Sequence, residues 1–264
     1  MGGTLSLEVQ DCPSPVVEEV YRTRRIPSAD GTTRPMNVYI PRDEGNLLYT
    51  LVRELQPAVT VEVGMANGLS TLFIAEALAA NGLGRHVAID PYQKTDWHSA
   101  GLALLRRARL DHLVELIELP SHQALPELER AGVKAGLIFI DGNHLFDYVM
   151  TDFLCADRLL VDGGIVVFDD SDWPAVTQVI RFALGNRHYE VACPEVVVEP
   201  VRYSPRLPAR LLRRLCRSVP KLAAQVRPDF LRPSHELGVR GRCVALRKLR
   251  SDDRDSQSRF HCAF

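Results

Sequence analysis

The sequence predicts a doubly wound α/β domain built on a mostly parallel, seven-stranded sheet. Between residues 46 and 249, short apolar runs alternate with segments of helical periodicity. This alternation is typical of parallel strands joined by crossover helices. The first run leads through a turn with two glycines into a helix, a usual feature of ligand-binding doubly wound sheets. A composition of 46% apolar and 25% charged residues in 264 is that of an ordinary globular protein.

The expected elements follow from the spacing of apolar residues. Strands are expected at residues 59–63, 86–89, 113–119, 137–140, 165–168, 189–198 and 243–249. Helices are expected where apolar residues recur every three or four positions, at 45–55, 70–80, 101–110, 125–131, 146–160 and 174–184. Pro57 ends the first of these helices, because proline cannot continue one.

Two segments lie outside this alternation. Residues 1–43 have no clear period and are expected to form an N-terminal arm, so that the domain proper is 44–264 and includes a helical insertion at 201–241. Within it, residues 201–235 hold nine basic residues and one acidic residue, a local charge of +8. Its apolar residues recur at helical spacing, which indicates short basic amphipathic helices. Such a segment either caps an acceptor pocket or docks on an anionic membrane surface, an anionic substrate or a carrier protein.

Charge and hydropathy exclude several classes of protein. The net charge of −1 argues against a chain that coats nucleic acid. The apolar runs are far shorter than the roughly 20 residues of a membrane-spanning helix, and residues 1–8 lack the pattern of a signal peptide. The cysteines form no close pair, which favours reduced thiols in a cytoplasmic protein. A homodimer is compatible with the sequence.

The turn after the first strand predicts the kind of ligand. Glycines at Gly64 and Gly68 would let backbone N–H groups and a helix N-terminus approach a ligand closely. The pattern is E-x-G-x-x-x-G, whereas a dinucleotide fingerprint is G-x-G-x-x-G. The carboxylate of Glu62 would repel a pyrophosphate and accept hydrogen bonds from an ammonium group. Asp90 ends the second strand, 26 residues after Gly64, where such folds place an acid on a ribose diol.

These motifs resemble those of the class I S-adenosylmethionine-dependent methyltransferases, and the resemblance spans roughly residues 44–249. It implies S-adenosylmethionine as cofactor, a sheet whose last strand is antiparallel, and an acid, Asp90, on the ribose. Ser121 stands where this family contacts adenine. The residues expected around the methionine end are Glu62, Gly64, Asn67, Gly68, Ser70 and Thr71, with Asp141 beside the cofactor.

Two further strands end in acidic residues, Asp141 and the pair Asp169-Asp170. Because the carboxyl ends of parallel strands meet at one edge of a sheet, these carboxylates should converge beside the cofactor pocket. Carboxylates that close repel one another unless they are protonated or bridged by a cation. Mg²⁺, which prefers oxygen ligands, would resolve the repulsion. The alternative is that such acids cap the following helices, as expected for Asp172 before Trp173-Pro174.

The acids sharpen the resemblance to metal-dependent O-methyltransferases of the catechol and macrolide-sugar types. It implies a Mg²⁺ site at Asp141, Asp169 and Asp170, and a small-molecule acceptor with a sugar, phenol or natural-product hydroxyl. His144 follows Asp141 by three residues, as in the sugar type, whereas the catechol type has lysine there. An imidazole titrates near neutrality, so His144 is the candidate general base. Trp97 and His98 are further candidates for the acceptor pocket.

Two other functions remain open at this stage. One is an NAD(P)-dependent oxidoreductase on the same sheet, which is disfavoured by Glu62 at the turn and by the absence of a third spaced glycine. The other is a non-catalytic protein that binds the cofactor, or that binds a partner through residues 201–235. The strand-end acids together with His144 favour an enzyme.

Overall fold

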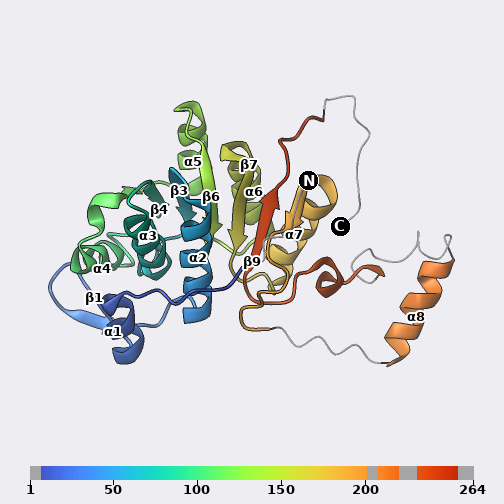
Figure 1. Ribbon diagram of the computed structural model, residues 1–264, viewed down its shortest axis with the longest axis horizontal. Helices are drawn as coiled ribbons and strands as arrows, with labels where there is room; N and C mark the ends of the chain where they lie inside the picture. Colours follow the sequence, from blue (N-terminus) through green and yellow to red (C-terminus); the bar gives the residue numbers. More distant parts are fainter. Residues whose placement is uncertain (1–6, 201–206, 220–230, 255–264) are drawn as a thin grey trace.

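A computed structural model describes residues 7–200, 207–219 and 231–254 of the chain (Figure 1). Its centre is a seven-stranded sheet with the strand order β5-β4-β3-β6-β7-β9-β8. All neighbours pair in parallel except β9, which is antiparallel to both β7 and β8. The predicted fold class, including the antiparallel last strand, is confirmed. The strands are β3 Val59–Val63, β4 Arg85–Ile89, β5 Val114–Ile117, β6 Ala135–Ile140, β7 Leu160–Phe168, β8 Tyr189–Val191 and β9 Val244–Lys248.

Helices cover both faces of this sheet, as Figure 1 shows. Strand β6 explains the two layers, because its residues alternate between two hydrophobic cores. Phe139 packs in a core with Phe73 of α3, whereas Ile138 and Ile140 pack in the other with Phe153 of α6. One face carries α2 Arg42–Leu55, α3 Leu69–Asn81 and α4 Ala100–Ala108, and the other carries α5 Ser121–Arg130, α6 Phe146–Leu159 and α7 Pro174–Asn186.

Most predicted elements are present. Strand β7 begins at Leu160, five residues before the strand predicted at 165–168, and two other elements differ near the opposite edge of the sheet. The strand predicted at 189–198 ends at Val191, because the chain turns at Cys193, whose carbonyl accepts a hydrogen bond from Val196. The helix predicted at 125–131 already begins at Ser121, with the carbonyl of Pro120 accepting from Ala124. Both differences lie where the chain leaves the carboxyl edge of the sheet. In these loops apolar residues do not recur at a regular spacing, so the ends of the elements are hard to predict.

From residue 7 onward, the N-terminal arm is folded and packs against the body. It contains α1 Pro15–Thr23 and a hairpin of β1 Arg25–Pro27 and β2 Thr33–Pro35. Ser14 begins α1 by accepting a hydrogen bond from the amide of Val17. Val17 and Ile26 are buried in the same core as Phe73 of α3. These elements are too short to give a visible period in the sequence, which explains why no structure was predicted for the arm.

The basic segment contributes α8 Leu207–Ser218 and a short helical turn, η2 Ser234–Leu237. Figure 1 shows α8 at the side of the molecule, away from the sheet. Arg217 of α8 binds the carbonyl of Leu231 and the carboxylate of Glu236. The rest of this segment, residues 201–206 and 220–230, lies outside the described residues. Across the described ranges, no helix combines the length and apolar character needed to cross a membrane.

Candidate active site

The glycine turn and the acidic strand ends meet at the centre of the sheet, where β3 pairs with β6. This is the point at which the strand order reverses, the usual ligand position in open α/β sheets. The amide of Asp141 donates to the carbonyl of Val63, so the two strand ends are joined directly. Gly64 has a φ of +93°, and a Cβ there would lie 2.0 Å from the carbonyl oxygen of Asp141. Only glycine fits this position.

The turn continues into α3 through Gly68, which caps the helix with a φ of +78°. A Cβ on Gly68 would lie 2.6 Å from the Cα of Gly101, so this glycine too is required by a close approach. Gly68 has no side chain to cap the helix, which leaves the first amides of α3 available to a ligand. The local sequence therefore builds a helix N-terminus that can bind the carboxylate of an amino-acid head.

A cavity connects this turn with the acidic cluster. Of the predicted site residues, the cavity is lined by Asn67, Ser70, Asp141, His144, Asp169 and Asp170, whereas Gly64 and Gly68 shape the turn without lining it. Asn67 also donates a hydrogen bond to the carbonyl of Val38 in the arm, at 2.9 Å. Sequence reasoning missed the contribution of the arm and of Arg242. The lining residues are Val38, Tyr39, Ile40, Met65, Ala66, Asn67, Leu69, Ser70, Asp141, His144, Asp169, Asp170 and Arg242.

Asp90 anchors the glycine turn to the end of β4. Its Oδ2 accepts from the amide of Ala66 at 2.7 Å, and its Oδ1 accepts from the amide of Tyr92 at 2.8 Å. Gln93 bridges the same groups by donating to Asp90 Oδ2 and to the carbonyl of Ala66. The carboxylate is 3% exposed. The structure thus gives Asp90 a role in shaping the turn, and its contact with a ribose stays a prediction.

Glu62 and Thr71 are both fully buried behind the turn. Thr71 donates to Glu62 Oε2 at 2.5 Å, and His86 Nε2 lies 3.2 Å from the same oxygen. Thr71 therefore positions Glu62, and neither side chain is among the residues that line the cavity. Oε1 of Glu62 has no hydrogen-bond partner among the described residues. The contacts of Glu62 and Thr71 with the cofactor stay predictions.

Ser121, Trp97 and His98 are absent from the described lining of this cavity. Ser121 is the first residue of α5, where its hydroxyl binds the carboxylate of Asp152 on α6. Burial raises the pKa of Asp152 to about 6, and the Ser121 hydroxyl opposes that rise. The adenine contact of Ser121 and the acceptor contacts of Trp97 and His98 stay predictions.

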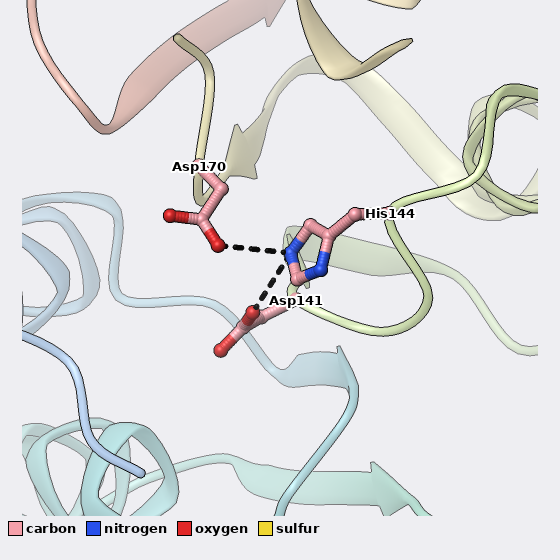
Figure 2. Close-up of side chains that lie close together, drawn as sticks. All are labelled: Asp141, His144 and Asp170. Atoms are coloured by element: carbon pink, nitrogen blue, oxygen red, sulfur yellow. Dashed lines mark ion pairs between the residues drawn. The ribbon is translucent and has the colours of Figure 1, made fainter. Parts of the chain in front are cut away.

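In the same cavity, His144 points between two carboxylates (Figure 2). Its Nε2 lies 3.2 Å from Asp170 Oδ2 and 3.6 Å from Asp141 Oδ1. The Asp141 carboxylate raises the pKa of His144, against the opposing effect of burial. Burial and the neighbouring Asp169 raise the pKa of Asp141 in turn, although His144 opposes the rise. The Trp173 ring, 5.0 Å from the imidazole, covers one side of it.

Asp169 lines the same cavity and is engaged by an arginine. It is 2% exposed and pairs with Arg242, whose Nε lies 3.1 Å from Oδ1 and whose Nη2 lies 3.4 Å from Oδ2. The metal set of Asp141, Asp169 and Asp170 stays a prediction. In the described chain, the three side chains that converge are those of Asp141, His144 and Asp170, with ligand atoms within 4.8 Å of one another.

This cluster fits a divalent cation. Nε2 of His144 faces two carboxylates but makes no hydrogen bond of good geometry to any described residue. Side chains that ligate one metal ion converge in this way. Asp170 has a φ of +46°, a strained conformation of the kind found at functional sites. One imidazole with two carboxylates suits Mn²⁺ and related ions, whereas Mg²⁺ prefers oxygen ligands alone.

None of the described residues of 207–219 lines this cavity. That residues 201–235 cap the acceptor pocket stays a prediction. Leu211, Leu212 and Leu215 of α8 face solvent, with exposed fractions of 68%, 53% and 56%. Contact with an anionic surface stays a prediction.

Comparison with known proteins agrees with this geometry. Residues 61–171, from β3 to the loop after β7, match a family model described as a methyltransferase domain. This stretch is similar to a methyltransferase domain and covers less than half of the chain. The matched region contains the glycine turn, Asp90, the acids after β6 and β7, and His144.

Curated proteins that are similar to this chain include O-methyltransferases. A caffeoyl-CoA O-methyltransferase of Medicago sativa is 29% identical over 141 residues, 50% of this chain and 52% of the relative. A flavonoid 3',5'-methyltransferase of Vitis vinifera is 27% identical over 51% of this chain and 56% of its own length. A transmembrane O-methyltransferase of Propithecus coquereli is 33% identical over 55% of this chain and 53% of its own length. The chain spans about half the length of these relatives.

Solved structures show the same methyltransferase fold. An O-methyltransferase of Streptomyces achromogenes involved in tomaymycin synthesis, solved in complex with SAM, is 26% identical with a TM-score of 0.51, over 70% of this chain and 82% of that one. An O-methyltransferase of Bacillus cereus, solved with SAH, is 23% identical with a TM-score of 0.50. The match covers 64% of this chain and 77% of that one. These matches give no support to the alternative of an NAD(P)-dependent oxidoreductase.

Proposed function

We propose that this protein transfers a methyl group from S-adenosylmethionine to a hydroxyl of a small molecule. The observation behind the proposal is that one cavity is lined both by residues of the glycine turn before α3 and by Asp141, His144 and Asp170. The first is suited to an amino-acid head, and the second to an oxygen that must lose a proton. The matched methyltransferase domain and its O-methyltransferase relatives support the same reaction class.

The turn would hold the cofactor in three ways. The first amides of α3 and the hydroxyl of Ser70 would bind its carboxylate. The unpartnered Oε1 of Glu62 would accept from its ammonium group. Asp90 has already accepted three hydrogen bonds and would keep one lone pair for the ribose. S-adenosylmethionine supplies an activated methyl group on a sulfonium, so the protein's task is to align the acceptor and exclude water.

The acidic cluster would prepare the acceptor oxygen. His144 is held between Asp141 and Asp170, where its Nε2 can accept the proton that the hydroxyl loses. Asp141 and Asp170 would hold a divalent ion together with either Asp169 or Nε2 of His144. Nε2 serves as the base only in the first case, since a coordinated nitrogen has no free lone pair. Such an ion, when bound, lowers the pKa of a coordinated hydroxyl. Tyr39 and Ile40 of the arm line the same cavity and would contact the acceptor.

Location and assembly are part of the proposal. The cysteines of the described ranges are buried free thiols, which suits a reducing cytoplasm. The homodimer, the absence of nucleic-acid binding and the peripheral surface contact by residues 201–235 stay predictions. The acceptor class, a sugar, phenol or natural-product hydroxyl, rests on the resemblance and on the relatives.

Calorimetric titration of the full chain with S-adenosylhomocysteine and, separately, with NADH tests the cofactor. We expect micromolar binding of S-adenosylhomocysteine and none of NADH, and the reverse preference would refute the proposal. A second experiment measures transfer of a labelled methyl group to a panel of catechols, flavonoids and sugar hydroxyls. Transfer to nitrogen acceptors alone would refute O-methylation while leaving the cofactor assignment intact.

A further inference from the structure

Arg242 reaches the acidic cluster from a backbone that is fixed on both sides. Its amide donates to the carbonyl of Val198 at 2.9 Å, and its carbonyl accepts from the amide of Ser171 at 2.6 Å. The hydroxyl of Ser171 also donates to the carbonyl of Gly241, at 2.6 Å. A Cβ on Gly241 would lie 2.3 Å from the Val198 carbonyl oxygen, so the two segments touch. The arginine is therefore anchored beside the loop that carries the acids.

The guanidinium contacts three carboxylates at once. Nε and Nη2 bind Asp169 in the two-pronged geometry described above, and Nη2 also lies 3.2 Å from Asp170 Oδ1. Nη1 lies 3.8 Å from Glu199 Oε2. Asp169 is almost fully buried and the Arg242 side chain is 30% exposed, so solvent screens the pair only in part. Each donor edge of Arg242 is thus directed at an acid.

The surrounding charges explain why a cation is needed here. Asp141, Asp169 and Asp170 line one cavity, and behind them Glu44 is fully buried without a hydrogen-bond partner in the described chain. Burial, followed by the charges of Asp169 and Asp141, raises the pKa of Glu44 well above its usual range. An arginine remains charged at any physiological pH. It therefore neutralises part of the negative charge of this cluster at all times, as a bound metal ion would do.

We propose that Arg242 is a positioning residue that competes with a divalent cation for Asp169 and Asp170. While the guanidinium binds Asp169, only Asp141, His144 and Asp170 can coordinate an ion. The positive charge of Arg242 next to Asp170 repels that ion. The all-oxygen set of Asp141, Asp169 and Asp170 forms only when Asp169 exchanges Arg242 for the ion. The chain consequently binds divalent cations weakly. This inference rests on the metal site of the proposed function and on no particular acceptor.

Titration with Mn²⁺ alone, followed by the loss of its free electron paramagnetic resonance signal, tests the inference on the full chain. Arg242→Gln should bind Mn²⁺ at least about tenfold more tightly than the wild type, because a charge within about 4 Å of the ligands is removed. Arg242→Lys, which keeps the charge, should stay within about threefold of the wild type. Arg158→Gln is the matched control, since Arg158 pairs with Glu129 far from the site and should leave the affinity unchanged.

Two outcomes would overturn the inference. One is an Arg242→Gln variant that binds Mn²⁺ no more tightly than the wild type, and the other is a wild type that already binds it with submicromolar affinity. Adding Asp169→Asn to Arg242→Gln should abolish the gain, because Asp169 is the ligand that the arginine releases. Binding of S-adenosylhomocysteine, measured in parallel, shows whether each variant is folded. A wild type that does not bind S-adenosylhomocysteine would count against the proposed function. The Mn²⁺ affinities of the wild type and the variants would still decide the inference about Arg242.

Discussion

The carbonyl oxygen of Asp141 occupies the space that a side chain on Gly64 would need: a Cβ on this glycine would lie 2.0 Å away from it. The two residues come from neighbouring strands, β3 and β6, and each begins one half of the candidate site. Their close approach sets the distance between the turn that would bind the cofactor and the acids that would prepare the acceptor. A change at Gly64 must therefore affect both halves.

Gly64→Ala should destabilise the protein and weaken its binding of S-adenosylhomocysteine. The substitution combines a positive φ with a backbone clash that no side-chain movement relieves, so we expect a loss of roughly 3 kcal/mol or more in the free energy of unfolding. Chemical denaturation measures it. Gly82→Ala is the control, because Gly82 has a φ of +67° with nothing near its Cβ and should cost only about 1 kcal/mol. Equal losses in the two variants would contradict the argument.

His144→Ala should lower kcat by about 10²- to 10⁴-fold, the usual contribution of a general base. The affinity for S-adenosylhomocysteine should stay within about threefold, because His144 belongs to the loop after β6 and pairs with Asp141 and Asp170. Single-turnover methyl transfer and calorimetry measure the two quantities. His112→Ala, at an exposed histidine, is the control and should be fully active. An active His144→Ala variant would remove histidine from the proposed chemistry.

Chelation should reduce turnover if the cluster of Asp141, His144 and Asp170 holds a divalent ion. After dialysis against EDTA we expect most activity to be lost and then restored by millimolar Mg²⁺ or by lower concentrations of Mn²⁺, since the donor set includes an imidazole. Asp170→Asn should raise the Mn²⁺ concentration needed for half-maximal activity. Activity that survives EDTA unchanged would argue for metal-free transfer with His144 as base.

Asp152 should make the stability of the fold depend on pH. Burial raises its pKa to about 6 from 3.8, so the folded state binds the proton more tightly than the unfolded chain does. Its contribution to stability is therefore full below about pH 3.8 and is lost as the pH rises to about 6. Asp152→Asn should raise the free energy of unfolding at pH 7 relative to wild type by roughly 1–3 kcal/mol. Denaturation at pH 4 and pH 7 measures the difference.

The control for this prediction is Glu127→Gln, at an exposed acid of the adjacent helix α5. It should leave the pH dependence of unfolding as in the wild type. If Asp152→Asn loses the same stability between pH 4 and pH 7 as the wild type, another group causes the dependence.

The fold was predictable from the sequence because its signals are local. Strand β6, for example, is an apolar run whose residues alternate between two cores, and the glycines of the turn after β3 stand where the backbone requires them. The convergence of Asp141 with Asp170 followed from the rule that parallel strands end at one edge of the sheet. These features depend on position along a strand, which the sequence displays directly.

The remaining site features depend on contacts between distant segments, and no local pattern displays them. Arg242 is 73 residues from Asp169 in the chain, and it follows the segment whose structure was hardest to predict. The arm reaches the cavity through Val38, which is bound by Asn67. Thr71 fits a binding motif by position, yet its side chain faces Glu62 in the interior. A motif fixes where a residue lies, and the packing around it decides which group its side chain meets.

The outward-facing leucines of α8 lead to the last prediction. On this helix Arg213 and Arg217 face Glu236, whereas Leu211 and Leu215 face solvent beside the exposed Arg214. Apolar and basic side chains on one exposed helix face suit an anionic lipid surface, and residues 201–235 carry a local charge of +8. We expect the full chain to co-sediment with phosphatidylserine-containing vesicles and not with phosphatidylcholine vesicles.

The double variant Leu211→Ser/Leu215→Ser should reduce that binding at least about fivefold, because it removes the apolar contact while keeping the charge. Raising the salt concentration from about 0.1 to 0.5 M should weaken the binding of the wild type, since the electrostatic part is screened. Leu83→Ser, at an exposed leucine outside α8, is the matched control and should bind as the wild type does. Equal binding of both vesicle types, or no effect of the double variant, would mean that the leucines of α8 do not form a lipid contact.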